Sequence, residues 1–526
     1  MKLRTIGSPL VLVAMLVILA AGISGVQKRM NTIRTEEELI DTEIVENAPP
    51  IVAFTTVALG SFRGLVADLL WLRSSRMQDK GNYFEMVQLA SWIVKLQPRF
   101  TGATAYLAWN LSYNVSVTFN SYEDRWRWVQ RGIELIRDEA LVYNPGDPEL
   151  YKELGWIYQH KLGQEMDDAN RYYKVQLAEQ LTHVLGQYPV DWARWADAPR
   201  TLPQLWASLE ERPAAEFRSY LASRGQGLGE LEKAFRAADG FSAETDALLI
   251  DLGIKDAVEL AFRVRWLQDK LKLDPALIHR LNQKYGTLDW RLPEAHAIYW
   301  AFKGLQEAEK GVEIACERMI FQSLSNAFRG GRMIYLKDAG TLQIMPNINV
   351  VDAVNNAYLE TMEKHPDNSS VDSGHQNFLI DAVVNLYTFG KREKAAEYLA
   401  KLRERYDGGT YRQSLDDFAL SELAGDIRHA NFDQGQAQVQ GFLFQAFYSL
   451  ALGAYDRADA LERIAERAWR KYMKTAGSGA KRRGLAPYPK MKQTMYDQCL
   501  ASFPPALRKR LEQAAAEQRA LTEDGS

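Results

Sequence analysis

The sequence predicts an all-α protein, an α-solenoid of antiparallel helix pairs, with one additional membrane-spanning helix near the N-terminus. Three observations lead to this prediction. Apolar residues between Phe54 and Gln180 recur at the three- and four-residue spacing of helices. Glycine and proline breaks divide that stretch into short segments. The chain has no run of alternating β-branched residues flanked by hairpin turns, so strands should be rare or absent.

The composition is that of a chain that folds mostly in water. Of its 526 residues, 47% are hydrophobic and 25% are charged, which argues against a largely disordered chain and against a polytopic membrane protein. The length exceeds the size at which one hydrophobic core stops growing, so several packed units are expected. The net charge of −3 gives no concentrated basic face, and we therefore expect no nucleic-acid partner.

The first element is a predicted membrane anchor. Residues 1–5 form a basic flank, and the 21 residues of the run 6–26 are uncharged. As a helix this run spans about 31 Å, close to the ~30 Å hydrocarbon thickness of a bilayer. A cleavable signal peptide is the alternative, because the run ends in several small residues. We favour a retained single-pass anchor, since the run is long and no Ala-x-Ala triplet closes it.

The sequence gives weaker evidence for the side of the membrane on which the bulk of the chain lies. Basic residues flank the run on both sides, so the positive-inside rule barely discriminates, and the signal-like organisation favours an extracytoplasmic (periplasmic) location for the bulk of the chain. Residues 27–50 are predicted to form an acidic juxtamembrane linker that two prolines terminate. The apolar stretch 51–72 contains Arg63 and Asp68 and is therefore predicted to be a helix outside the bilayer.

Residues 51–188 carry a repeat-like pattern. The clearest instance is Tyr151-x2-Leu154-Gly155-x2-Tyr158, preceded by Pro145. This segment resembles the tetratricopeptide repeat, whose first helix has the pattern W-x2-L-G-x2-Y and whose end is marked by a proline. In that resemblance the glycine lets two helices approach closely, and the leucine and tyrosine fill the groove between them.

Further matches to the repeat are weaker. Gly81 and Pro98 bound a segment similar to the second helix of a repeat, and Tyr387 and Ala396 occupy matching places in a C-terminal repeat-like region, 346–475. Residues 189–345 do not repeat and are predicted to be helical, as an inserted module or as eroded repeats. Residues 476–526 are predicted to form a basic loop followed by a helix and a polar tail.

The resemblance implies a binding scaffold for a protein partner and not an enzyme, because this fold serves many functions through its surfaces. Candidate partner-binding residues are the aromatic and basic side chains of the first repeats: Trp109, Arg125, Trp126, Arg127, Arg131 and Trp156. Core packing of helix pairs uses the same aromatic residues, and arginines are equally typical of a solvated helix face. Both alternatives stay open from the sequence.

Catalytic signatures are missing from the sequence. It has no nucleophile elbow, dinucleotide fingerprint or paired histidines at metal-ligand spacing, so we expect no catalytic site, cofactor or metal. The alternative is an enzyme, or its accessory domain, acting on envelope glycans, with Asp289, Glu294 and His296 as candidate acid and base groups. A solvent-open cleft holding these three side chains would favour it. Cys316 and Cys499 are predicted to be unpaired buried thiols, and one disulfide between them is the alternative if this part of the chain lies outside the cytoplasm.

A third hypothesis is a structural protein that contacts lipid. It would use the basic loop at 481–492, provided that this loop and the anchor face the same way.

Overall fold

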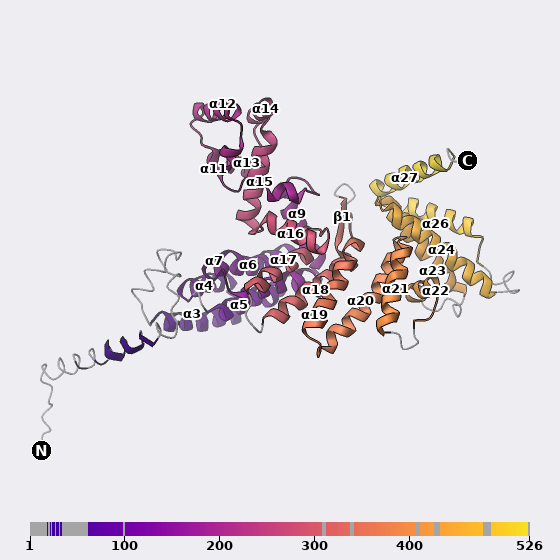
Figure 1. Ribbon diagram of the computed structural model, residues 1–526, viewed down its shortest axis with the longest axis horizontal. Coiled ribbons are helices and arrows are strands. Elements are labelled where there is room, and N and C mark those ends of the chain that lie inside the picture. Colours follow the sequence, from indigo (N-terminus) through magenta and orange to yellow (C-terminus); the bar gives the residue numbers. More distant parts are fainter. Residues whose placement is uncertain are drawn as a thin grey trace, which may run out of the picture. The chain divides into compact units, whose positions relative to one another are not determined.

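The computed structural model describes residues 62–97, 100–307, 312–336, 341–406, 411–424, 432–476 and 485–523, with ten further positions between 18 and 33. Helices dominate this part of the chain, which confirms the all-α class (Figure 1). No helix within these residues is both long and apolar enough to cross a membrane. Most of the predicted span 6–26 and of the linker 27–50 lies outside the described positions, and so does Pro98.

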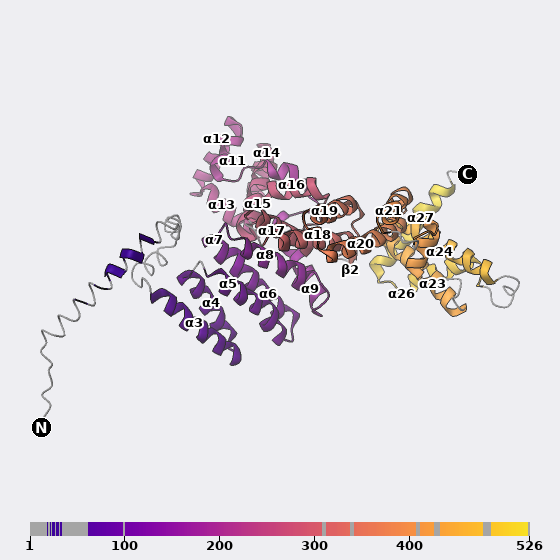
Figure 2. The ribbon, with the colours of Figure 1, turned by 60° about the horizontal axis from the view of Figure 1, so that its bottom comes forward.

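The chain divides into two compact units. Unit 1 comprises the residues up to Thr104 together with 139–145, and unit 2 comprises 105–138 and 146–526. In unit 1, α3 (Phe62–Asp79) packs along α4 (Tyr83–Leu96), as Figure 2 shows. Gly81 has a φ of +70° in the turn between them, a conformation that suits glycine because it has no Cβ.

Unit 2 begins within α5, and several of its first helices run directly into short π-helical segments. The elements from α5 to α9 are α5 (Thr101–Asn110), η2 (Leu111–Val115), η3 (Ser116–Thr118), α6 (Tyr122–Glu134), η4 (Leu135–Ala140), α7 (Leu141–Tyr143), α8 (Pro148–Trp156), η5 (Ile157–Leu162) and α9 (Asn170–Leu185). Of these, α7 and the end of η4 fall within residues 139–145 and belong to unit 1. Asp147 caps α8, where its Oδ1 accepts a 2.9 Å hydrogen bond from the N–H of Glu149. Pro148 occupies the first turn, where its missing N–H costs no helical bond.

The non-repeating segment folds as short helices around a longer one. Its elements are α10 (Trp192–Ala196), α11 (Leu202–Ser208), α12 (Glu211–Ser223), α13 (Leu228–Ala238), α14 (Ala243–Asp251), α15 (Lys255–Leu271) and α16 (Pro275–Tyr285). Helices α11, α13 and α14 pack on α15, which also packs on α9. Buried Phe235, Leu249 and Phe262 lie at the centre of this group.

Helix α8 has its most extensive packing partner far along the chain. Its partner is α17 (Pro293–Glu307), which also packs on α18 (Glu313–Gly330), and Figure 2 shows α8 beside α17. The residues predicted to build the repeat, Tyr151, Leu154 and Tyr158, are all buried in unit 2. The helix pair formed by α8 is therefore closed by a helix that follows it by more than 130 residues, after the non-repeating segment.

A small hairpin follows α18. Strand β1 (Arg332–Leu336) pairs antiparallel with β2 (Thr341–Met345), with Arg332 opposite Met345. These are the two strands in the described part of the chain, in agreement with the expectation that strands are rare.

The helices of the C-terminal region pack on their neighbours in sequence and also on more distant ones, since α23 packs on α26 and α27 as well as on α24. It contains η7 (Ile348–Val350), α19 (Val351–Lys364), α20 (Ser369–Thr388), α21 (Arg392–Tyr406), α22 (Leu415–Ala424), α23 (Phe432–Ala451), α24 (Tyr455–Ala476), α26 (Tyr488–Ser502) and α27 (Pro505–Glu523). Glycine turns at Gly390 and Gly453, with φ of +74° and +76°, separate the pairs α20/α21 and α23/α24. Tyr387 is buried, but Ala396, predicted to pack in the repeat, is exposed, because the neighbouring Ala395 turns to the core.

Candidate functional site

Three π-helical segments, η2, η4 and η5, interrupt the helices of the first repeats. A π-helical turn inserts an extra residue into a helix and is found frequently at functional sites, because it re-aims the neighbouring side chains. Segments η2 and η5 lie against each other in unit 2. Their polar side chains meet there: a 3.2 Å hydrogen bond joins the hydroxyl of Tyr113 in η2 to Nδ1 of His160 in η5.

The rings at this meeting point form a continuous row, which we call the aromatic row: Trp109, Tyr113, His160 and Trp156. Trp109 stacks on Tyr113 with ring centroids 5.6 Å apart. Tyr113 lies 5.7 Å from His160, which in turn stacks on Trp156 at 4.6 Å. The two tryptophans, 47 positions apart in sequence, therefore end one row of rings that spans four elements, α5, η2, η5 and α8.

Both tryptophans border a hollow of about 460 Å³ between α8 and α18. Its lining residues come from α5, α8, η5 and α18: Trp109, Lys152, Glu153, Trp156, Gln159, Ala315, Arg318, Met319 and Gln322. Gln159 fastens η5 to α18, because its Nε2 donates to the carbonyl oxygen of Met319 at 3.1 Å and to Oγ of Ser323 at 2.8 Å. The floor of the hollow is thus held by buried hydrogen bonds.

The charges around the hollow are not all paired. Lys152 lies 3.1 Å from Glu153 and also pairs with Glu149. Arg318 is exposed, and among the described residues it has no carboxylate within ion-pairing distance. An unpaired guanidinium beside an apolar surface is suited to bind a carboxylate in two parallel hydrogen bonds.

The aromatic row carries no charge at neutral pH. Burial, followed by the positive charge of Lys161, lowers the pKa of His160, so its imidazole is neutral. Burial, followed by repulsion from Glu153, raises the pKa of Tyr113 above its usual value. Uncharged rings present flat apolar faces to a ligand.

A buried ion cluster lies behind the row. Nζ of Lys161 pairs with Asp167 at 2.6 Å, and both side chains are at most 6% exposed. Asp167 also accepts from the hydroxyl of Tyr173 at 3.0 Å and from Arg125 at 3.0 Å. Burial alone would raise the pKa of Asp167, but the hydrogen bonds from Lys161 and the Ala169 N–H outweigh it and hold that pKa well below its usual range. Lys161 also lies over the ring of Tyr113, which ties the cluster to the row.

The six candidate partner-binding residues do not lie at one site in the structure. Trp109 and Trp156 border the hollow. Trp126 is buried and stacks on Tyr173 at 5.8 Å, and Arg125 joins the ion cluster.

The remaining two candidates lie on α6. Arg127 pairs with Glu123 and Asp124 on its own helix, and Arg131 pairs with Glu134. Arg127, whose side chain is 66% exposed, matches the solvated-face alternative, whereas the side chain of Arg131 is half-buried.

Residues of α18 were not predicted for this site. Arg318, Met319 and Gln322 follow Trp156 by more than 160 positions, and no local pattern in the sequence relates the two segments. Only the packing of α17 and α18 onto α8 brings them together.

The candidate acid and base residues do not share an open cleft. His296 is 1% exposed, its Nε2 donates to the carbonyl oxygen of Trp290 at 2.8 Å, and its ring stacks on Tyr158. Asp289 binds the guanidinium of Arg291 and accepts from the N–H of Met333. Glu294 is buried, and burial raises its pKa. The condition that would have favoured a glycan-processing enzyme is therefore not met by these residues.

The described part of the chain contains histidine, cysteine and acidic residues that were considered as metal ligands, and two cysteines. No group of three or more potential ligands among its His, Cys, Asp and Glu residues could hold a metal ion. Cys316 and Cys499 are both buried and unbonded, which confirms the prediction of two free thiols.

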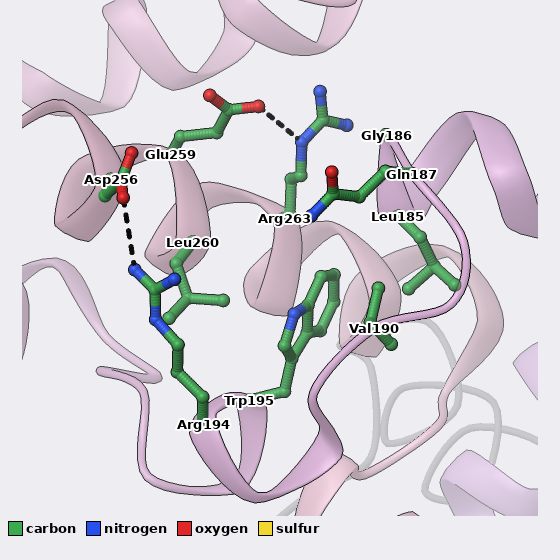
Figure 3. Close-up of a pocket in the computed structure, with 10 residues that line it drawn as sticks. All are labelled: Leu185, Gly186, Gln187, Val190, Arg194, Trp195, Asp256, Glu259, Leu260 and Arg263. Carbon is green, nitrogen blue, oxygen red and sulfur yellow. Dashed lines mark hydrogen bonds and ion pairs between the residues drawn. The ribbon is translucent and has the colours of Figure 1, made fainter.

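A second pocket of about 290 Å³ lies where α9 ends against α15 (Figure 3). The two arginines that line it are already paired with acidic side chains. Nε of Arg263 donates to Glu259 at 2.8 Å, and Arg194 lies 3.6 Å from Asp256. Arg263 also donates to the carbonyl oxygens of His183 and Val184, at the negative end of α9. These contacts give the arginine a structural role in closing the helix end.

Comparison with known proteins identified no relative of this chain. Neither a family model, nor a curated protein sequence, nor a solved structure matches this chain.

Proposed function

We propose that the protein is a membrane-anchored, tetratricopeptide-like scaffold that binds a protein partner at the hollow between α8 and α18. The observation that carries the proposal is that the aromatic row ends at the same hollow as Arg318, which pairs with no carboxylate in the described part of the chain. Aromatic and methionine side chains provide adaptable apolar contacts, and tryptophan and arginine dominate the binding energy of protein interfaces.

The partner's chemistry follows from the lining. Trp109, Trp156 and Met319 suit one apolar or aromatic side chain, and a volume of about 460 Å³ accommodates a side chain but not a folded domain. Arg318 suits a neighbouring carboxylate. The proposed ligand is therefore a peptide segment of a protein in which an aromatic or aliphatic residue lies next to Asp or Glu.

The hollow is a better candidate than the pocket of Figure 3. In that pocket Arg194 and Arg263 already bind acidic side chains of the same chain, so a ligand would have to displace an existing ion pair. At the hollow a ligand carboxylate would meet Arg318 without that competition.

The membrane part of the proposal comes from the sequence. The run 6–26 is long enough to span a bilayer, and we place the helical units on the extracytoplasmic side. Resistance of the protein to alkaline extraction from membranes, together with protease digestion of spheroplasts but not of intact cells, tests both statements. Release by alkali would contradict the anchor, and protection in spheroplasts would contradict the location.

Partner binding is tested by affinity purification of the detergent-solubilised full chain from its native host. The variants are Trp156→Ala and Arg318→Glu, with Arg127→Ala as the control, because Arg127 is 66% exposed and lies away from the hollow. A stoichiometric protein partner should be recovered with the wild type and the control and be reduced at least tenfold with both hollow variants. Equal recovery with all four proteins contradicts the proposed site.

A photo-crosslinking amino acid at Gln322 distinguishes the class of ligand. Gln322 is exposed at the rim of the hollow, so a bound peptide should crosslink there, while the same probe at position 127 should give no crosslink. Retention of the wild type on isolated envelope glycan, with no protein crosslink at position 322, would instead favour the glycan-binding alternative.

A further inference from the structure

The aromatic row continues beyond the hollow onto the surface of α5. The ring of Tyr106 lies 6.1 Å from that of Trp109, between centroids, and Tyr106 is 47% exposed. Tyr106, Trp109 and Tyr113 follow one another at three- and four-residue intervals, which places them on one face of the continuous helix that α5 and η2 form. The row and this fifth ring therefore make a strip of aromatic faces that starts at an exposed ring and ends at the hollow.

The two tryptophans of the row carry hydrogen-bond donors that the described part of the chain does not use. Trp109 and Trp156 are half-buried, and Nε1 of neither ring is buried or donates to another described residue. The core tryptophan Trp290, by contrast, donates from Nε1 to Oδ1 of Asn282 at 3.1 Å. An accessible indole N–H beside an aromatic face is suited to donate to a carbonyl oxygen of a ligand.

The two indole donors distinguish the ways in which a peptide can bind here. The residues that line the hollow all belong to helices, so they offer no sheet edge to which a peptide could add as a strand. A helical peptide uses its backbone carbonyl groups internally and would leave the indole donors without an acceptor. A polyproline II segment has no internal hydrogen bonds, so its carbonyl oxygens are available while its apolar rings pack on aromatic faces.

The order of the helices gives such a segment a direction and a length. Element η2 contacts η5, and α8 contacts α18, so the strip leads from Tyr106 on α5 across α8 and η5 to Arg318 on α18. Neighbouring helices lie about 8–10 Å apart, so the two intervals span about 16–20 Å. A polyproline II segment of about six residues covers this distance at ~3.1 Å per residue.

We propose that the partner supplies a proline-rich segment of about six residues in the polyproline II conformation, which crosses from Tyr106 to the hollow and ends in an acidic residue at Arg318. This inference rests on the proposed function and names the part of the partner that binds. The indole N–H groups of Trp109 and Trp156 donate to backbone carbonyl oxygens of the segment, and the aromatic rings pack on its prolines. The segment is already extended before binding, so little conformational entropy is lost.

The test measures binding of a synthetic peptide to the detergent-solubilised full chain by fluorescence anisotropy. The probe is a fluorophore-labelled peptide of six prolines followed by two aspartates, and its control has the same composition but is built from D-proline, which forms the mirror-image helix. The L-proline peptide should bind at least tenfold more tightly than its control. Equal affinities for the two peptides, or no binding of either at millimolar concentration, overturn the inference.

Matched variants test the indole donors. Trp156→Phe keeps an aromatic face but removes the N–H group, and it should weaken binding of the L-proline peptide at least threefold, with an unchanged thermal unfolding midpoint showing that the variant is folded. Arg127→Ala should leave the affinity unchanged, because this side chain is 66% exposed on α6 and does not line the hollow. Wild-type affinity in both Trp156→Phe and Trp109→Phe overturns the assignment of these donors.

A charge reversal tests the direction of the segment. Arg318→Glu should weaken binding of the aspartate peptide at least tenfold and restore binding for a peptide of six prolines that ends in two lysines. A photo-reactive group at the acidic end should crosslink to α18, and one at the opposite end should crosslink to α5. Unchanged affinity in Arg318→Glu, or the reverse crosslinks, overturns the placement of the acidic end at α18.

Failure of this inference can be told apart from failure of the proposed function. A protein partner that is recovered from the native host and lost with Trp156→Ala and Arg318→Glu, combined with no binding of the L-proline peptide, leaves the scaffold in place and overturns only the polyproline II ligand. Equal recovery of the partner with all variants, together with no peptide binding, overturns both.

Discussion

Gly155 of α8 lies against Met319 of α18. A Cβ atom on Gly155 would be 2.6 Å from Sδ of Met319 and 3.3 Å from the carbonyl oxygen of Ala297 in α17. The close approach predicted at this glycine is present, but the helices that approach are α17 and α18 and not the next helix in sequence, α9. Since Met319 also lines the hollow, the same contact that closes the helix pair positions one wall of the proposed binding site.

Substitution Gly155→Ala should destabilise the protein by about 1–3 kcal/mol, because the added methyl group overpacks the contact with Met319 and Ala297. The midpoint of thermal unfolding measures the effect. Gly441→Ala is the control: this helical glycine has nothing within 4 Å of its Cβ position, so alanine should be neutral or stabilise by up to ~1 kcal/mol. Equal midpoints for the two variants would show that α8 is not tightly packed at Gly155.

Substitution Asp167→Asn should cost about 3–5 kcal/mol, because it leaves the ammonium of Lys161 buried without its counter-charge. Urea unfolding of the two proteins at pH 7 measures this difference. The exposed pair of Arg127 with Glu123 provides the comparison, and Arg127→Ala should change stability by no more than ~0.5 kcal/mol. A similar small effect for Asp167→Asn would mean that water reaches the ion cluster behind the aromatic row.

Substitutions of Gly186 and Arg263 should be non-additive. Gly186 has a φ of +75°, and its Cβ would lie 2.4 Å from Cζ of Arg263, so Gly186→Ala combines backbone strain with a steric clash (Figure 3). The single variant should lose more than the ~1–3 kcal/mol of backbone strain alone. In the Arg263→Ala background the clash is gone, and only the strain should remain. Additive losses in the double-mutant cycle would contradict the contact.

The stability of the protein should fall between pH 6.5 and pH 4 because of His296. Burial lowers the pKa of this imidazole from 6.5 to about 4 in the folded protein. The unfolded chain therefore binds a proton in this interval that the folded chain does not, so the stabilisation is complete above pH 6.5 and is lost as the pH falls toward 4. The loss is on the order of 3 kcal/mol.

Unfolding curves at successive pH values check this dependence. His296→Gln should flatten part of the slope, leaving the share of His375, whose pKa burial also lowers to about 4. His183→Gln, at a ring that is 53% exposed, should leave the slope as it is in the wild type. A wild-type slope in His296→Gln would show that this ring gains a proton in the folded state as readily as in the unfolded one.

The sequence by itself determined the helical class and the local devices that produce it. Glycine and proline breaks in the sequence indicated that the helices are short, and the structure places Gly390 and Gly453 in turns between paired helices, where the backbone needs a residue that accepts positive φ. Burial of Leu154 and Tyr158 was implied by the resemblance of their segment to the first helix of a tetratricopeptide repeat, and both residues are buried, as is Tyr151. The tryptophans of the hollow, Trp109 and Trp156, were also chosen from composition, although the pattern did not separate them from Trp126, which is core.

Only the tertiary structure decided which helices meet. Local periodicity identifies the apolar face of α8 but carries no information about its partner, so the pairing with α17 across the non-repeating segment was invisible, and with it Arg318 and Met319. The choice between core packing and partner binding for the tryptophans was resolved in the same way: a tryptophan is core or surface according to the helix that covers it. Helix propensity and capping depend on residues close together in sequence. Burial depends on contacts between segments that can lie at any distance from each other in the sequence.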